Sequence, residues 1–313
     1  MKKKTAAVLI AGWVAAWASG AEMPRMLLAA GNKVFVMESD KSVSWTFTGK
    51  GFGGVYDAWP MTNGNVLFSS KFAVLEVTPE KKTVWEYRVE PNAKLNELDS
   101  CQPLENGNIL IMDSGHNRLI EVNRAKEILV EIPLPSKAES PHARYRIGRK
   151  TVRGTYLVGM LQDRVQEYAA NGTLLREINL KTLGTQQGGF FVFDIVELKN
   201  GNLIISTGFD GRWLEVTPDN KIVWEVSKKT MPELNICFAG GAVRLPDGNT
   251  ILCNGDWHVK KEANQAVQLL EVTPDYRIAW SVSHSDLEGR IAPVQEKENK
   301  LAQFQLTQVK VLP

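Results

Sequence analysis

A unit of about 45 residues recurs through most of this 313-residue chain. Each unit contains an apolar stretch, a turn of the Asn-Gly-Asn type, a second apolar stretch, a polar loop and two further strand-like runs. The turns are anchored by Asn63, Asn106, Arg153, Asn200 and Asp247, and the third runs by Glu76, Glu121, Glu167, Glu215 and Glu271.

Short β runs joined by hairpin turns at such a period are typical of propeller blades. Asn-Gly and Asp-Gly favour tight hairpins because both central residues accept a positive φ. The sequence therefore predicts an all-β chain of four-stranded antiparallel blades. In the second unit the strands are expected at residues 56–61, 66–69, 74–78 and 83–88.

The two ends of the chain decide the number of blades. Before the second unit, the chain supplies three strands and lacks an innermost one. Residues 309–313 match residues 242–246, which form the innermost strand of the last complete unit. We therefore predict a six-bladed β-propeller, closed by residues 305–313 pairing with residues 26–30, which leaves no exposed sheet edge. The complete units cover about residues 50–89, 95–133, 142–179, 188–227 and 236–284.

Residues 1–21 have the pattern of a secretory signal peptide. Three lysines precede an apolar run at residues 5–17, and the small residues 19–21 come before Glu22. The run is short for a membrane span. We expect a secreted or periplasmic protein with a single propeller domain over residues 22–313; the alternative is an N-terminal anchor that is not cleaved.

Loss of the signal segment changes the formal net charge from +2 to −1, with 34 basic against 35 acidic residues. A near-neutral protein with interspersed charges lacks the electrostatic footprint of a nucleic-acid binder. We therefore expect no nucleic-acid partner, and a monomer without a membrane span after cleavage. Cys101, Cys237 and Cys253 are too few for a disulfide framework. They are expected to be small buried hydrophobic residues, the alternative being a Cys237–Cys253 pair.

Loops between the second and third strands, and between blades, share one face of a propeller, where binding is usual. Arg118, Arg164 and Arg212 occupy the same place in such loops, each three residues before the recurring glutamate. Three guanidinium groups in adjacent blades would suit a carboxylate, sulfate or phosphate. The alternative is that each arginine pairs with an acidic residue of its own or a neighbouring blade.

Histidines in the same loops are candidates for general bases, nucleophiles or metal ligands. His116 lies near Asp113, and His258 lies near Asp256 in a loop at residues 254–268 that is long enough for a lid or pocket wall. His142 is a third candidate. The alternative is solvated or locally hydrogen-bonded imidazoles.

Two tryptophans and one further aspartate complete the candidate set. Trp59 on an inner strand and Trp257 in the long loop are candidates for ligand stacking, and Asp210 lies beside Arg212. No spacing of ligands indicates a metal site, and no phosphate-binding loop is present. We therefore expect no metal and no cofactor. Trp45, Trp85, Trp224 and Trp280 are expected to pack between blades.

The fourth unit departs from the others. Residues 144–150 are basic where the other units are apolar, and Arg-Gly-Thr at residues 153–155 replaces the Asn-Gly-Asn turn. A single deviant blade often lines a functional face.

Residues 75–79 (Leu-Glu-Val-Thr-Pro), followed by residues 83–86 (Thr-Val-Trp-Glu), resemble repeats of the pyrroloquinoline-quinone-like propeller superfamily. They are also similar to arylsulfotransferase and NHL-type six-bladed propellers. The quinone-dependent dehydrogenases typically have eight blades, adjacent cysteines and a calcium site, and this chain departs from that pattern. The arylsulfotransferase resemblance implies sulfuryl transfer by channel histidines with an arginine, parts that His116 and His258 would take with Arg118 or Arg212.

These features are compatible with two functions. The first is a non-catalytic binding propeller that presents its loop face to a glycan, peptide or partner protein outside the cytoplasm. The alternative is an arylsulfotransferase-like or lyase-like enzyme that uses the histidines and arginines at the channel mouth.

Overall fold

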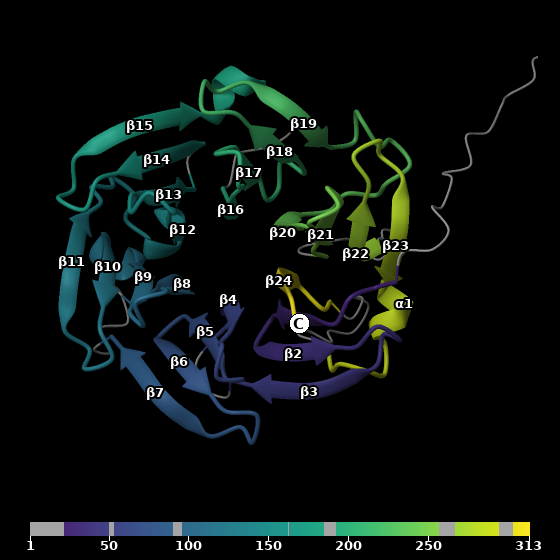
Figure 1. Cartoon of the computed structure of the whole chain (residues 1–313), viewed down its shortest axis with the longest axis horizontal. Coiled ribbons are helices and arrows are strands. Elements are labelled where there is room, and N and C mark those ends of the chain that lie inside the picture. The colour runs from purple at the N-terminus through teal and green to yellow at the C-terminus, as the bar shows by residue number, and fades with distance from the viewer. Residues whose placement is uncertain are drawn as a thin grey trace, which may run out of the picture.

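The computed structural model describes residues 22–49, 53–89, 96–161, 163–184, 192–256, 267–293 and 303–313. These residues form six antiparallel sheets of four strands each, arranged as the blades of a ring (Figure 1). The predicted six-bladed propeller is therefore confirmed. The predicted signal segment, Trp257, His258 and most of the long loop lie outside the described residues.

The first three blades run from the innermost to the outermost strand as follows. Blade 1 comprises β24 (Leu306–Val311), β1 (Met26–Ala30), β2 (Lys33–Met37) and β3 (Val43–Thr48). Blade 2 comprises β4 (Val55–Pro60), β5 (Val66–Ser70), β6 (Ala73–Val77) and β7 (Thr83–Arg88). Blade 3 comprises β8 (Leu98–Pro103), β9 (Ile109–Asp113), β10 (Arg118–Val122) and β11 (Ile128–Pro133).

The other three blades follow the same order. Blade 4 comprises β12 (Tyr145–Lys150), β13 (Tyr156–Met160), β14 (Arg164–Tyr168) and β15 (Leu174–Asn179). Blade 5 comprises β16 (Asp194–Glu197), β17 (Leu203–Ser206), β18 (Trp213–Val216) and β19 (Ile222–Val226). Blade 6 comprises β20 (Ala239–Arg244), β21 (Thr250–Asn254), β22 (Val267–Val272) and β23 (Ile278–Ser283).

Helical turns are short and lie between strands. They are η1 (Ser114–His116), η2 (Pro141–Ala143), η3 (Leu180–Leu183) and α1 (His284–Leu287). In the described part of the chain, none has the length and hydrophobicity needed to cross a membrane.

The ring closes where the C-terminal strand meets the N-terminal one. Strand β24 pairs with β1 in antiparallel register, with Leu28 opposite Val309, and the Thr307 hydroxyl donates to the carbonyl oxygen of Ala29 at 3.1 Å. On the other side of β24, a Cβ on Gly241 of β20 would lie 3.1 Å from the Cα of Gln308, closer than an ordinary contact, so glycine favours this close approach. The predicted closure is confirmed.

The core consists of apolar clusters, each formed between two neighbouring blades. Trp85 packs between blades 2 and 3, Trp224 between blades 5 and 6, and Trp280 between blades 6 and 1. Trp45 packs against the cluster between blades 1 and 2. The prediction that these four tryptophans pack between blades is confirmed.

The recurring glutamate accepts hydrogen bonds from side chains of the recurring turn. Glu76 Oε1 accepts hydrogen bonds from the side-chain amides of Asn63 at 3.0 Å and Asn65 at 2.6 Å. In blade 3, Asn106 and Asn108 donate to Glu121 in the same way. A buried carboxylate is tolerated only when its oxygens are bonded. The repeated spacing of these residues is therefore a requirement of the blade rather than a sign of ligand binding.

The ring has two faces, which differ in the connections they carry. The turn face carries the turns between the first and second strands of each blade, such as the one with Gly64 at φ 83°. The loop face carries the connections between second and third strands and between blades. The innermost strands, β4, β8, β12, β16, β20 and β24, surround the centre of the ring, which is called the channel below (Figure 1).

Candidate functional site

The three arginines predicted to bind an anion are paired with carboxylates of their own blades. Each reaches the glutamate thirteen residues later on the outermost strand. The pairs are Arg118 with Glu131 at 3.3 Å, Arg164 with Glu177, and Arg212 with Glu225 at 2.9 Å. Such contacts are those expected of the alternative, in which the arginines belong to the repeat. Anion binding by them stays a prediction.

The histidine candidates within the described residues lie on the loop face. His116 in η1 has Nδ1 2.9 Å from Asp113 Oδ1, and its side chain is 36% exposed. His142 in η2 has Nδ1 2.5 Å from Glu97 Oε1 and is 57% exposed. The second oxygen of Asp113 accepts a hydrogen bond from Arg118 Nε at 2.9 Å, so both of its oxygens are engaged.

The remaining candidates have different surroundings. Asp210 is buried near Arg212, with 3.9 Å between their charged atoms. Asp256 accepts hydrogen bonds from the backbone N–H groups of Phe304 and Gln305, which ties the start of the long loop to the closing strand. Burial raises the pKa of Asp256. Trp59 lines a cavity in the channel.

Bulges near the start of three consecutive inner strands aim side chains at the loop-side end of the channel. Strand pairing skips one residue in β4, β8 and β12, and the extra residues are Tyr56, Asp99 and Arg146. Bulges of this kind often redirect a side chain beside a functional site. Here they bring together an aromatic ring, a carboxylate and a guanidinium from three blades.

Arg146 is the centre of this group. Its guanidinium lies 4.5 Å from the ring centre of Tyr56 and 5.3 Å from that of Phe193, and Nη1 is 2.7 Å from Asp99 Oδ1. Burial raises the pKa of Asp99 well above its usual range, against the attraction of Arg146. Burial also raises the pKa of Tyr56. The cluster thus holds titratable groups in an environment of low polarity.

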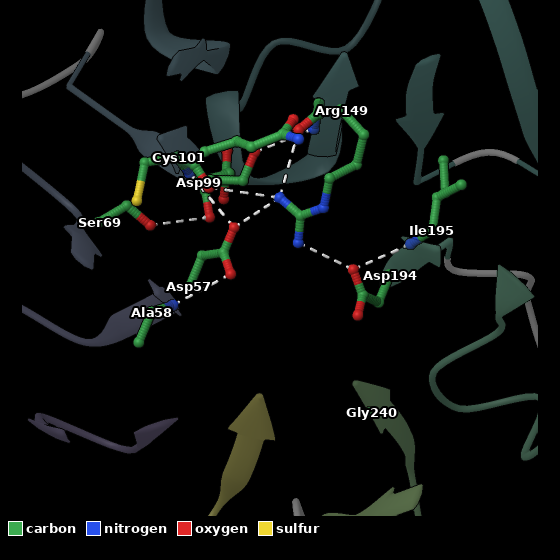
Figure 2. A network of polar contacts seen from close by, with 12 residues as sticks. Asp57, Ala58, Ser69, Asp99, Cys101, Arg149, Asp194, Ile195 and Gly240 are labelled. Atoms are coloured by element: carbon green, nitrogen blue, oxygen red, sulfur yellow. Dashed lines mark hydrogen bonds and ion pairs between the residues drawn. The ribbon is translucent and has the colours of Figure 1, made fainter. Parts of the chain in front are cut away.

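Arg149 lies deeper in the channel, between carboxylates of two other blades. Its guanidinium lies 2.6 Å from Asp57 Oδ2 of β4 and 2.9 Å from Asp194 Oδ1 of β16, and Figure 2 shows it between the two carboxylates. The three side chains are at most 6% exposed. Burial would lower the pKa of Arg149, but the two carboxylates outweigh it and raise that pKa. The basic strand of the deviant blade is thus explained, because its arginines neutralise the inner aspartates.

A cavity of about 720 Å³ occupies the turn-side end of the channel. Its lining includes Trp59, Arg149 and Lys310 from inner strands and Val152, Asn200 and Gly248 from turns. The ring centre of Trp59 is 5.1 Å from the Arg149 guanidinium carbon and 4.3 Å from Lys310 Nζ. The indole Nε1–H is shielded from solvent and donates to none of the described residues.

The cavity carries an excess of positive charge. Three of its cations are neutralised: Arg149 by Asp57 and Asp194, Lys150 by Glu121 and Arg244 by Glu215. Among the residues that the structure describes, no carboxylate lies within ion-pair distance of Lys199 or Lys310, which also line it. The lining carboxylate, Glu197, lies 3.7 Å from Arg153. Two cations are therefore left to attract an anion.

The cysteines are all free thiols. Cys101 and Cys253 are buried, as expected, whereas Cys237 is partly exposed. Cys237 and Cys253 therefore do not form the disulfide that was the alternative.

Sequence reasoning missed the residues that the channel brings together, namely Glu97, Asp99, Arg146, Arg149 and Lys310. A signal for them was present in the basic stretch at residues 144–150. A buried charge on an innermost strand is costly unless an opposite charge or hydrogen bonds neutralise it. Aspartates on other inner strands are the natural partners.

Comparisons with solved structures agree with the fold. A protein of unknown function from Bacteroides caccae is 22% identical, with a TM-score of 0.75 over 92% of this chain and 98% of that one. A streptogramin B lyase is 13% identical, with a TM-score of 0.59 over 87% and 84% of the two chains. An inactive virginiamycin B lyase from Staphylococcus aureus with quinupristin is also 13% identical, with a TM-score of 0.58 over 83% and 85%.

These identities show a shared propeller architecture and no more. The sequence matches no protein-family model and none of the curated proteins. The chain is thus similar in fold to propellers that include lyases, and its chemistry has to be argued from its own residues.

Proposed function

We propose that this protein is a binding propeller that works outside the cytoplasm and holds a small organic anion in the turn-side cavity. The observation that carries the proposal is the contact between Trp59 and Lys310, whose ammonium lies 4.3 Å from the ring centre. Among the described residues, no carboxylate forms an ion pair with this ammonium. A cation held over an aromatic ring, with no described carboxylate to neutralise it, offers charge and apolar surface to one ligand.

The size and walls of the cavity indicate what kind of anion fits. Its volume of about 720 Å³ is within the usual range for small-molecule sites. Apolar side chains such as Leu157, Ile195 and Val243 form part of the wall, together with the charged groups. The best match is a flat or apolar body that carries one carboxylate or sulfate group.

Binding is favoured over catalysis at this cavity. Among the described lining residues there is no histidine, cysteine, serine or aspartate to act as a nucleophile or general base. Glu197 accepts a hydrogen bond from the backbone N–H of Val152 at 2.8 Å and is paired with Arg153. The enzyme alternative therefore depends on the loop face, where His116 and His142 lie.

The cavity faces away from the loops that the sequence favoured for binding. A glycan, peptide or protein on the loop face stays a separate prediction. Export rests on the signal-like segment alone, and fractionation with N-terminal sequencing tests it: the mature protein should begin near Glu22 and leave the cytoplasm. Recovery of the intact N-terminus in the membrane fraction would support the uncleaved anchor instead.

Calorimetric titration with three probes of similar shape tests the binding proposal. We expect 4-nitrobenzoate and 4-nitrophenyl sulfate to bind, and neutral 4-nitrobenzamide to bind at least about tenfold more weakly, since a hydrogen bond to a charged group contributes about 1.5–3 kcal/mol. The aryl sulfate is chosen because of the resemblance to arylsulfotransferases. Release of 4-nitrophenol with a phenolic acceptor would favour the enzyme alternative.

Two variants locate the site. Lys310→Gln should weaken binding of the benzoate at least about tenfold, and Trp59→Ala should weaken all three probes. The matched control is Lys82→Gln, which removes an exposed lysine in an outer turn. Equal affinities for the Lys310→Gln and Lys82→Gln variants, or equal affinities for the benzoate and the benzamide, would contradict the proposal.

A further inference from the structure

A second cluster, at the loop-side end of the channel, contains the donor atoms of a metal site. Glu97, Asp99 and His142 each offer one ligand atom, and these atoms lie within 4.8 Å of one another. Glu97 and Asp99 are buried, whereas the imidazole is 57% exposed at the loop face. The three residues come from two blades, so no local spacing in the sequence could indicate them.

One carboxylate oxygen in the cluster is buried without a partner. Arg146 donates a hydrogen bond from Nη1 to Asp99 Oδ1 at 2.7 Å, but Asp99 Oδ2 has no hydrogen-bond partner among the described residues. The nearby hydroxyl of Ser114 donates instead to the carbonyl oxygen of Tyr145 at 3.1 Å. A buried, unbonded carboxylate oxygen is costly, and a bound cation is one way to satisfy it.

The supporting residues hold the cluster in place before any ligand arrives. Arg144 donates from Nη1 to the carbonyl oxygens of Ser114 at 3.1 Å and Gly115 at 3.2 Å, and from Nε to that of Ala138 at 2.9 Å. These bonds fasten the η2 turn, with His142, to the neighbouring η1 turn. Hydrogen bonds to ligands and to their loops are a regular feature of metal sites.

We propose that Glu97, Asp99 and His142 bind one divalent transition-metal ion at the loop-side end of the channel, with Zn²⁺ or Mn²⁺ as the ions that suit this donor set. Imidazole favours transition metals over Ca²⁺ and Mg²⁺, which prefer oxygen alone. The ion would replace the hydrogen bond between His142 Nδ1 and Glu97 Oε1, atoms that are 2.5 Å apart.

The charges in the cluster are compatible with such an ion. Two carboxylates face one guanidinium, that of Arg146, so an ionised cluster carries an excess of one negative charge. The rings of Tyr56 and Phe193 flank Arg146 and keep its cation in place on the side of Asp99 Oδ1. Arg146 Nη1 is bonded to Asp99 Oδ1 at 2.7 Å and lies 3.9 Å from Glu97 Oε1, so the guanidinium orients Asp99 and leaves Asp99 Oδ2 for the metal.

Three protein ligands leave the ion with open positions. Catalytic zinc sites are built in this way, whereas structural sites are closed by four protein ligands. Because His142 lies at the surface of the loop face, the open positions would be reached by water or a ligand from that side. This site is separate from the anion cavity, and either can fail without the other.

Titration of chelator-treated, full-length protein with ZnCl₂ tests the proposal. We expect one Zn²⁺ per chain, and a loss of affinity of at least about 100-fold in His142→Phe, since even the outer partners of ligands contribute about 10–100-fold. With CoCl₂, visible absorption bands should appear in the wild-type protein and not in His142→Phe. The exposed position of His142 lets this variant keep the fold, which a thermal melt verifies.

His116→Phe is the matched control, because His116 is also a loop-face imidazole paired with a buried carboxylate, that of Asp113. Both oxygens of Asp113 are engaged, so no oxygen is left for a metal. His116→Phe should therefore bind Zn²⁺ as the wild type does. Absence of stoichiometric binding, unchanged affinity in His142→Phe, or equal losses in the two variants would overturn the proposal.

Discussion

Replacing Arg149 with methionine is expected to lower the free energy of unfolding by about 3–5 kcal/mol. The guanidinium lies 2.6 Å from Asp57 and 2.9 Å from Asp194, and both carboxylates are fully buried. Methionine leaves these two negative charges in the channel without a counter-ion. Because a protein domain is stable by only about 5–15 kcal/mol, the loss is a large share of the total.

Urea denaturation of the wild type and three variants measures this effect. The matched control is Arg277→Met, which breaks an exposed pair with Asp275 and should cost less than about 1 kcal/mol. Adding Asp57→Asn and Asp194→Asn to Arg149→Met should recover part of the loss. The amide oxygens can still accept the backbone hydrogen bonds that both aspartates now accept, and amides need no counter-ion.

The refuting result is specific. If Arg149→Met and Arg277→Met cost the same, the network contributes no more than a surface ion pair. If the two asparagine substitutions destabilise the Arg149→Met variant further, the aspartates act through contacts other than their charge. Either outcome would show that Arg149 of β12 is not required to neutralise the buried charges of Asp57 and Asp194.

Three further predictions concern other parts of the ring. Deleting residues 304–313 removes β24 from its pairing with β1 and should markedly lower the melting temperature or prevent soluble expression; unchanged melting would contradict the closure. Burial disfavours ionisation of Glu121, but hydrogen bonds from Asn108 and Lys150 outweigh it and lower its pKa from 4.5 to about 2. The stabilisation is thus present above the unfolded pKa and is lost as pH falls toward 2, so the stability advantage of the wild type over Glu121→Gln should shrink between pH 5 and 2 in acid-unfolding curves. Maleimide should modify Cys237 first and slowly, because burial raises the pKa of that thiol to about 11, and mass spectrometry of the unfolded protein should find no disulfide.

Much of the fold could be predicted because the blade is a local unit. The Asn-Gly turn, the strand pair beside it and the glutamate that bonds Asn63 and Asn65 all lie between Val55 and Glu76. The match between residues 309–313 and residues 242–246 predicted the closing strand for the same reason, since equivalent strands meet equivalent neighbours. Strand ends were displaced by about one residue, as the observed β4 (Val55–Pro60) shows.

The candidate site was not predictable in this way. Arg149 and Asp57 are 92 residues apart in the chain, and Arg149 and Asp194 are 45 apart. Likewise, His142 meets Glu97 across 45 residues. Such contacts depend on how the ring brings inner strands together and on bulges that place Asp99 and Arg146 at the channel mouth.

The sequence by itself determined the repeat, the number of blades and the strand that closes the ring, because hairpin turns and apolar alternation act between near neighbours. Only the tertiary structure decided which charges face one another in the channel. In it, Arg118, Arg164 and Arg212 form ion pairs with glutamates of their own blades. Lys310 lies over the ring of Trp59, and no carboxylate among the described residues forms an ion pair with it. Charge pairing at the centre of the ring depends on the whole ring, because the partners must be close in space and shielded from water.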